Sequence, residues 1–235
     1  MGNSTISLGL GLGGGKSATS SGRAAGGGGF ANAYSVEMDA TNEFIEPASG
    51  AAITLGTTDV CMSFWFRQNS AGLRYLVVDD SLNGRIYINS GSLIIHGSWG
   101  IKSVSNAVTT GNWYHLLLTR DSGTQKVYLD GVLIYTASKS TSVNIRRFAA
   151  YGSVGSYYLD GNMDEIALWE SGQDANVATI YNSGVPSDIS SLNPVHWWRM
   201  GETDSGTGTS VTNVGSSSTA LNLNNGAAFV TDVPS

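Results

Sequence analysis

The chain has 235 residues, a formal net charge of −6 and only 13% charged residues, with 31 glycines and one cysteine. This length fits one large all-β domain or two small ones and is enough to bury a substantial core. The acidic balance disfavours nucleic-acid binding, which needs clustered Lys and Arg. Cys61 has no partner for an internal disulfide, and no run approaches the ~20 apolar residues of a membrane span. The start lacks a charged region before its leucines, so we expect no signal peptide.

The first predicted element is a glycine-rich arm over residues 1–30, which holds eleven of the 31 glycines. Such a segment cannot bury enough apolar surface to offset the entropy of ordering it. Alternate apolar residues nevertheless follow the pattern of a strand that adds to a foreign sheet edge. We expect the arm to bind other protein chains through Ile6, Leu8, Leu10, Leu12, Lys16 and Arg23. A disordered tail or linker is the alternative, and residues 31–235 form the predicted domain.

From Tyr34 onward, short β-rich runs alternate with clusters of Gly, Asn, Asp and Ser. This rhythm is typical of a sandwich or jelly roll. The predicted strands lie at about residues 34–39, 43–46, 51–55, 60–67, 74–79, 84–88, 92–97, 113–120, 124–130, 132–137, 147–150, 155–160, 163–169, 195–200 and 220–223.

The clearest hairpin signal is Asp130-Gly131, because this pair supplies the positive φ angles of a type I′ turn. On the strand before it, Val127 and Leu129 face one way while Lys126 and Tyr128 face the other. This alternation predicts one buried and one solvated side.

One short helix is predicted after the strand at residues 163–169. Residues 171–174 read as a capping box, Val177, Ile180 and Tyr181 form an apolar stripe, and Gly184 is a stop signal.

An ordered series of motifs resembles the laminin-G-like, concanavalin-A-like jelly-roll domains. The series runs Trp113 and His115 before an apolar run, then Tyr128 with Asp130-Gly131, then Gly161, Asp164, Glu165, Ile166 and Trp169. The resemblance implies an all-β, antiparallel jelly-roll sandwich. The strand at Trp197–Glu202 usually precedes the first strand in relatives but closes this chain, and it can build the same sandwich because jelly-roll termini are neighbours. The stretch Ile180–Glu202 and the opening Leu-Gly repeat also resemble structural proteins of tailed bacteriophages.

We predict no enzyme and no catalytic residue. Gly15-Lys16-Ser17 lacks the first glycine of a phosphate-binding loop, since that position is Leu10. Retaining glycosidases need two carboxylates about 5–5.5 Å apart, whereas Asp164 and Glu165 are consecutive and are expected on opposite faces of a strand. His115 is expected to be a hydrogen-bonded core residue, and the basic pair Arg146-Arg147 a solvated edge.

Calcium is left open, because the resemblance implies that relatives often bind Ca²⁺ with loop carboxylates and carbonyls. The candidate ligands are Asp79, Asp80 and Asn83 in one turn, and Asp160 and Asn162 in another. Turns select Asp and Asn for backbone reasons as well. Trp99, Tyr157 and Tyr158 could stack on sugars, but we expect most of them in the core.

The leading hypothesis is a non-enzymatic virion structural protein, either a capsid decoration or a tail-associated component. It would be a homo-oligomer or multi-copy chain, assembled in the host cytoplasm and tied to neighbouring chains by its arm. The alternative is a calcium-dependent, lectin-like adhesion module that binds glycan, and a glycan hydrolase is the outsider. Neither nucleic acid nor a membrane is an expected partner. We also expect six residues to be buried between two sheets: Trp65, Leu117, Val127, Leu129, Ile166 and Leu168.

Overall fold

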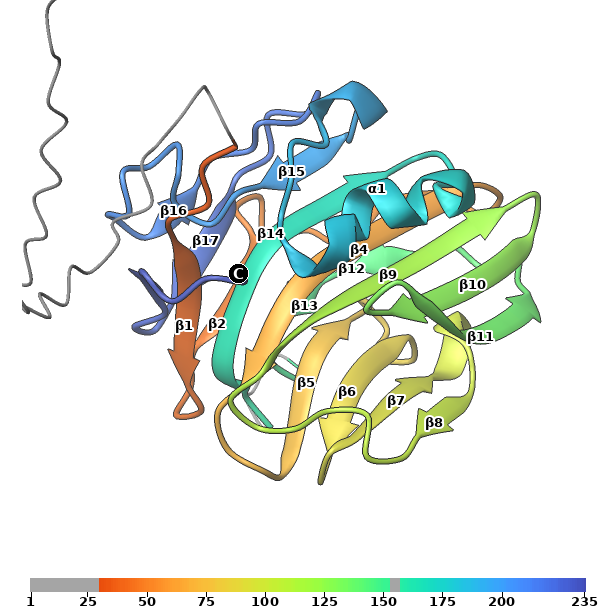
Figure 1. Cartoon of the computed structure of the whole chain (residues 1–235), viewed down its shortest axis with the longest axis horizontal. Helices are drawn as coiled ribbons and strands as arrows, with labels where there is room; N and C mark the ends of the chain where they lie inside the picture. The colour runs from red at the N-terminus through yellow and green to blue at the C-terminus, as the bar shows by residue number, and fades with distance from the viewer. Residues whose placement is uncertain (1–29, 153–156) are drawn as a thin grey trace, which may run out of the picture.

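The structure is a computed structural model that describes residues 30–152 and 157–235, and it consists almost entirely of antiparallel β-strands (Figure 1). Two eight-stranded sheets pack face to face, as predicted for the jelly-roll sandwich. Sheet A runs β11 (Val132–Ser138), β10 (Thr124–Leu129), β9 (Trp113–Asp121), β4 (Val60–Gln68), β14 (Asp160–Trp169), β1 (Ser35–Asp39) and β18 (Ala228–Val230), with β15 (His196–Trp198) also paired to β14.

Sheet B forms the other layer. It runs β16 (Ser210–Val211), β17 (Leu221–Asn224), β2 (Phe44–Pro47), β13 (Arg147–Phe148), β5 (Leu73–Val78), β6 (Arg85–Asn89), β7 (Ser92–His96) and β8 (Lys102–Val104). A separate small ladder joins β3 (Ile53–Thr54) to β12 (Asn144–Ile145). No helix in the described ranges is long and apolar enough to cross a membrane.

The two ends of the domain meet in sheet A, as the jelly-roll argument predicts. Ser35 pairs with Val230 across β1 and β18, and β15 pairs with the second half of β14. The strand that closes this chain therefore occupies a place in the same sandwich. Asp130 and Gly131 have φ angles of 49° and 74°, which confirms the type I′ turn between β10 and β11.

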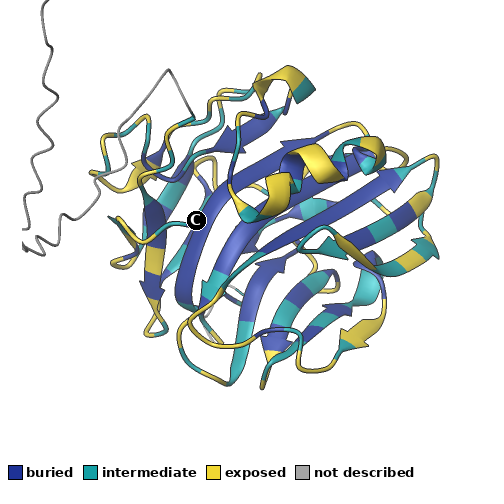
Figure 2. Ribbon diagram, in the orientation of Figure 1, coloured by how far each residue is buried: buried dark blue, intermediate teal, exposed yellow. Residues whose placement is uncertain are grey.

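Side chains on the inner faces of both sheets form the main core. Along β4, Met62, Phe64 and Phe66 face sheet B and are fully buried. The intervening residues of β4 face outward, yet they are buried too, because the helical segment after β14 covers this side of sheet A. Figure 2 shows β4, β14 and β9 dark blue along most of their length, behind α1 (Val177–Tyr181).

A second apolar layer lies between sheet A and this helical segment. It consists of Cys61, Leu117, Ala167, Trp169, Val177, Ile180, Ile189 and Trp197. Leu117 is fully buried as expected, but it lies in this outer layer instead of between the sheets. Trp65 stacks on Tyr181 of α1, with the ring centroids 6.0 Å apart, so it too lies outside the main core. Leu129 is only partly buried.

The second side of β10 is only partly solvated, because contacts to the helical segment cover part of it. Lys126 Nζ lies 2.6 Å from Asp174 Oδ2, and the Tyr128 hydroxyl donates to Asp174 Oδ1 at 2.5 Å. Asp174 opens the 3₁₀ turn η2 (Asp174–Asn176), so the helical segment covers this face as well. The alternation was interpreted correctly, but a non-local element covers the polar side.

The helical segment is shorter than predicted, and its capping box does not form. The Ser171 hydroxyl accepts from the side chain of Gln173, and neither η2 nor α1 has a side-chain cap. The α-helix ends at Asn182, which adopts the left-handed conformation at φ 45°, before the predicted stop at Gly184. The turns η3 (Asn182–Gly184) and η4 (Ser190–Leu192) follow.

Candidate functional site

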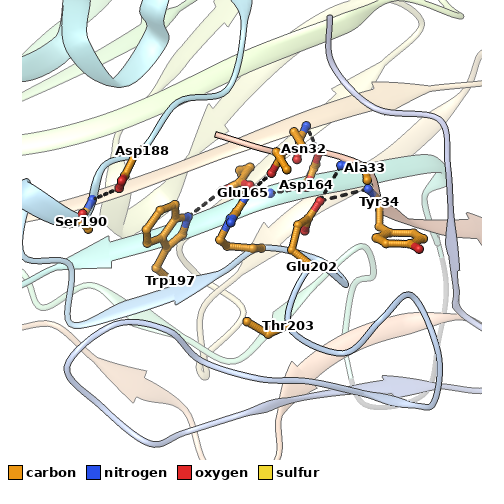
Figure 3. Close-up of polar contacts among 12 residues, drawn as sticks. Asn32, Ala33, Tyr34, Asp164, Glu165, Asp188, Ser190, Trp197, Glu202 and Thr203 are labelled. Carbon is orange, nitrogen blue, oxygen red and sulfur yellow. Dashed lines mark hydrogen bonds and ion pairs between the residues drawn. The ribbon is translucent and has the colours of Figure 1, made fainter. Parts of the chain in front are cut away.

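Asp164 and Glu165 lie on the same face of sheet A, so the expectation that they point to opposite faces is wrong. Asp164 pairs with Trp65 and Ala167 with Ser63, which leaves one extra residue on β14. Glu165 takes up this β-bulge with a φ of 46°. Both carboxyl groups therefore face outward, together with Glu202 and the incoming segment at residues 30–34 (Figure 3).

Asp164 and Glu202 accept hydrogen bonds from residues 30–34, which we name the anchor segment, whereas Glu165 bonds to β15 and the residue after it. Asn32 donates to Asp164 Oδ2 at 3.0 Å, and the backbone nitrogens of Ala33 and Tyr34 donate to Glu202 Oε1 at 2.7 and 3.0 Å. Glu165 accepts from Trp197 Nε1 at 2.5 Å and from Arg199 Nε at 3.1 Å.

Burial dominates the electrostatics of this acidic cluster. Asp164 is fully buried and Glu165 is 5% exposed. Burial raises the pKa of Glu165 to about 8, although Arg199 opposes the shift, and burial also raises the pKa of Asp164 well above its usual value. Asp164 and Glu202 hold the anchor segment on the outer face of sheet A.

Ser63 and His115 form a hydrogen-bonded pair in the same layer, with 2.7 Å between Ser63 Oγ and His115 Nε2. This contact confirms His115 as a hydrogen-bonded core residue, and burial lowers its pKa to about 3. The two residues line a cavity of about 10 Å³, which is enough for one water molecule. The pair therefore has the chemistry of a nucleophile and base but no room for a substrate.

The five calcium candidates do not come together. Asp79 organises the β5–β6 turn, because its oxygens accept from the nitrogens of Asn83 and Gly84 and from the hydroxyls of Ser81 and Ser98. The Asp80 carboxylate instead faces Arg146, with 3.7 Å between Asp80 Oδ1 and Arg146 Nε.

Asp160 and Asn162 belong to β14 in the other sheet, where the Asn162 amide donates to Ser35 Oγ. Within residues 30–152 and 157–235, no three His, Cys, Asp or Glu side chains are placed to hold a metal. Calcium binding at either turn therefore stays a prediction. The six arm residues predicted to bind partner chains lie outside the described residues.

The outer face of sheet B carries an arrangement that the sequence interpretation missed. Tyr75 of β5 lies against three other rings, at centroid distances of 4.9 Å to Tyr87, 4.6 Å to Tyr151 and 6.0 Å to Tyr157. We name these four residues the tyrosine cluster. Tyr87 faces outward because its neighbours in β6, Ile86 and Ile88, point into the core.

The tyrosine cluster is open to solvent on one side. Tyr157 is 48% exposed, and Tyr87 and Tyr151 are half-buried. Of the three aromatic residues considered for sugar stacking, Trp99 is fully buried, as expected, whereas Tyr157 is the most exposed ring of the cluster. Tyr158 is partly buried. The alternating run Arg85-Ile86-Tyr87-Ile88-Asn89 could have indicated an outward-facing ring, but the other three tyrosines come from elsewhere in the chain.

An arginine-lined hollow adjoins the tyrosine cluster on the same face. We name it the arginine hollow; it has a volume of about 190 Å³ and is lined by Val78, Asp80, Leu82, Arg146, Arg147 and Gly152. Arg147 pairs with Val78, and Val78 pairs with Arg85, whose guanidinium carbon is 5.9 Å from the Tyr151 ring centre. Arg147 is 5% exposed, so the expected solvated edge is wrong for this residue.

A larger hollow of about 470 Å³ lies at the rim of sheet A, beside the end of α1. Two tryptophans line it: Trp65, which is 3% exposed and packed between His115 and Tyr181, and Trp113, which is half-buried. None of these rings is classed as exposed, whereas Tyr157 of the tyrosine cluster is 48% exposed.

Two antiparallel sheets with an aromatic outer face define a lectin-like β-sandwich. The chain belongs to the concanavalin A-like lectin/glucanases superfamily, whose family model matches residues 39–176. This membership confirms the predicted class of domain.

Solved structures show the same fold. A proposed carbohydrate-binding protein from Bacteroides ovatus superposes with a TM-score of 0.65 at 14% identity, over 87% of this chain and 62% of its own length. The chain thus spans less than two thirds of that protein. A heptameric SAP-like pentraxin from Limulus polyphemus gives a TM-score of 0.50 at 12% identity, over 64% of this chain and 82% of the pentraxin. A search of curated proteins found no match.

Proposed function

We propose that this chain is a non-enzymatic, glycan-binding module and that its tyrosine cluster contacts the sugar. The observation that carries the proposal is the exposed side of this cluster, where Tyr87, Tyr151 and Tyr157 surround the buried Tyr75. Tyrosine rings offer an apolar surface to the C–H face of a sugar and a hydroxyl to its polar groups. An open sheet face also suits a chain-like ligand better than a closed pocket does.

The proposal is non-enzymatic because the groups with catalytic chemistry lie on sheet A and are closed to solvent. Asp164, Glu165, Ser63 and His115 are each at most 5% exposed. They lie on the other side of the sandwich from the tyrosine cluster.

We further propose that the module is displayed on a multi-chain assembly, with the virion as the leading hypothesis. The supporting observation is the position of the anchor segment. Phe30 stacks on Trp197 of β15 at 5.9 Å, on the outer face of sheet A. The arm thus joins the domain on one face of the sandwich, while the tyrosine cluster lies on the opposite face. This arrangement would leave the glycan-binding face free when the arm is held. The heptameric assembly of the Limulus polyphemus pentraxin is one precedent for multiple copies of this fold.

Glycan binding is tested by screening the purified full-length chain against an array of neutral and acidic oligosaccharides, followed by titration calorimetry with the best ligand. Tyr157→Ala and Tyr87→Ala should each weaken binding by about threefold to tenfold, the range expected for one aromatic contact. Tyr181→Ala, which alters the hollow on sheet A, is the matched control and should bind normally. The proposal would be overturned if the protein bound no glycan on the array, or if only Tyr181→Ala lost binding.

A further inference from the structure

Arg147 is a buried guanidinium whose hydrogen-bonding capacity is not filled. Its side chain is 6% exposed and lies over the Phe44 ring, with 3.9 Å from the guanidinium carbon to the ring centre. One terminal nitrogen donates to the Gly152 carbonyl and the other to Glu46 Oε2 at 3.1 Å. Within the described residues, its buried Nε has no partner. A buried donor without an acceptor is costly, so its presence at a hollow needs an explanation.

The charges around the arginine hollow leave positive charge without a close partner. Glu46 Oε2 accepts from both Arg146, at 2.8 Å, and Arg147, so one carboxylate serves two guanidinium groups. Arg85 donates to the Leu82 carbonyl and has no carboxylate within 4.0 Å in the described part of the chain.

The other two carboxylates nearby do not fill this deficit. Asp79 is engaged by four donors from its own turn and from Ser98. Asp80 is 65% exposed and lies 3.7 Å from Arg146, so solvent screens that pair. Arg85, Arg146 and Arg147 therefore share an excess of positive charge on this face, and Arg146 and Arg147 line the hollow itself.

The arginine hollow and the tyrosine cluster are continuous through Tyr151-Gly152. Tyr151 packs on Tyr75, and the next residue, Gly152, lines the hollow and accepts from Arg147. A sugar stacked on the tyrosine cluster would therefore have its neighbouring substituent or sugar unit at the guanidinium groups. A guanidinium presents planar, parallel N–H donors, and a carboxylate is the sugar substituent that matches them in charge and shape.

We propose that the ligand of this face is an acidic glycan and that the arginine hollow binds the carboxylate of a uronic or nonulosonic acid. The inference rests on the proposed glycan binding. It assigns the ring contact to the tyrosine cluster and the choice of acidic over neutral sugars to Arg146 and Arg147.

The test compares pairs of ligands that differ only in the carboxylate, by titration calorimetry on the full-length chain. One pair is an oligogalacturonate and its carboxyl-reduced counterpart; the other is sialyllactose and lactose. The acidic member of at least one pair should bind about tenfold or more tightly, as expected for hydrogen bonds to a charged group. The pair that shows the difference identifies the source of the carboxylate. Affinity for the acidic ligand should also fall as NaCl is raised.

Variants separate specificity from folding. The Arg146 side chain is 25% exposed. Arg146→Gln should lower the affinity for the acidic ligand about tenfold and leave the affinity for the carboxyl-reduced ligand unchanged. Arg147→Lys keeps the charge but not the planar donors, and it should also lower the preference for the acidic over the carboxyl-reduced ligand. Lys139→Gln, which makes the same charge change on the loop after β11, is the matched control.

Two outcomes would overturn the inference, and they are distinguishable. If acidic and neutral partners bind equally while Tyr157→Ala weakens both, the acidic specificity is wrong and glycan binding stands. If no member of either pair binds and the array also retains nothing, the specificity and the proposed function both fail.

Discussion

Glu165 and Trp197 are joined by a hydrogen bond of 2.5 Å between the carboxyl oxygen Oε2 and the indole nitrogen. This contact connects the bulge of β14 to β15, the strand that follows the helical segment. The edge of β14 pairs with β1 before the bulge and with β15 after it. The bulge therefore marks the point where the edge changes partner, and the change turns Glu165 toward the anchor segment.

The buried Glu165 carboxyl should make stability depend on pH. Burial raises its pKa from 4.5 to about 8 in the folded chain. Between these pH values the folded protein keeps a proton that the unfolded chain has released, so the free energy of unfolding should fall as pH rises through the window. Urea denaturation at several pH values measures this slope. Glu165→Gln should reduce it without removing it, because burial also raises the pKa of Asp164, and an equal slope in both proteins would contradict the prediction.

His115 should act in the opposite direction at lower pH. Burial lowers its pKa from 6.5 to about 3. The unfolded chain takes up a proton below its own pKa while the folded chain stays neutral, so the free energy of unfolding should fall as pH drops from about 6.5 towards 3. His115→Gln should reduce this dependence, and His196, whose pKa burial lowers to about 4, should keep the remainder.

Ser63→Ala is the matched control for His115, because it deletes the 2.7 Å hydrogen bond but leaves the imidazole to titrate. It should lower stability and keep the acid-side slope. Since the windows of Glu165 and His115 overlap, each slope is measured as the difference between the parent and its variant. An unchanged slope in His115→Gln would argue against a buried neutral imidazole.

How much of this structure the sequence could predict depends on whether the signal was local. The turn at Asp130-Gly131 and the strand at residues 84–88 are encoded by neighbouring residues; the turn appears as predicted, and the strand matches β6 within one residue. The strands β8, β12, β16 and β18 have two or three residues each, which is too short for an alternating pattern, and they were missed. A strand is predicted at 155–160, but residues 157–159 do not form one, and residues 155–156 lie outside the described part of the chain.

The acidic cluster at Glu165, the tyrosine cluster and the arginine hollow were not predicted either, because they too depend on non-local contacts. Nothing in the run around Glu165 signals a bulge, because a glutamate at φ 46° depends on the two strands that share one edge of β14. The tyrosine cluster and the arginine hollow combine β5, β6, β13 and the connection after β13. The residues were visible in the sequence, but their proximity follows from sheet topology alone.

Both apolar layers should contribute to stability. Ile166→Ala, in the main core, and Leu117→Ala, beneath α1, should each lower the free energy of unfolding by about 2–5 kcal/mol, because each leaves a cavity at a fully buried site. Val132→Ala is the control, since Val132 is 65% exposed and should change stability by less than about 0.5 kcal/mol. Chemical denaturation measures all three. A small loss in Leu117→Ala alone would show that the helical layer packs loosely.

The turn glycine Gly131 should resist substitution for two separable reasons. It has a φ of 74°, and a Cβ there would lie 2.8 Å from Tyr181 Cδ1. Gly111 has a similar φ of 82° with nothing within 4 Å of a Cβ. Gly111→Ala should therefore cost about 1–2 kcal/mol for the backbone alone, and Gly131→Ala should cost more. Equal losses in thermal denaturation would show that Tyr181 gives way.

The N-terminal arm should be separable from the domain at a defined residue. Phe30 stacks on Trp197, Asn32 donates to Asp164, and Ala33 donates to Glu202, so residues 30–34 belong to the body of the domain. Deleting residues 2–29 should leave the melting temperature nearly unchanged, because all these contacts are kept. Deleting residues 2–33 should lower it, because the deletion leaves buried Asp164 without its amide donor and uncovers Trp197.

The same pair of deletions tests the assembly role. We expect the shorter deletion to yield a soluble chain that still binds its glycan but is no longer incorporated when expressed alongside the other components of its particle. Incorporation is measured as copies per purified particle, with the full-length chain as reference. Because the shorter deletion spares the domain, a loss of incorporation would be assigned to the arm and not to misfolding. Normal occupancy without residues 2–29 would contradict an anchoring arm and favour a soluble lectin-like module in which this segment is a spectator.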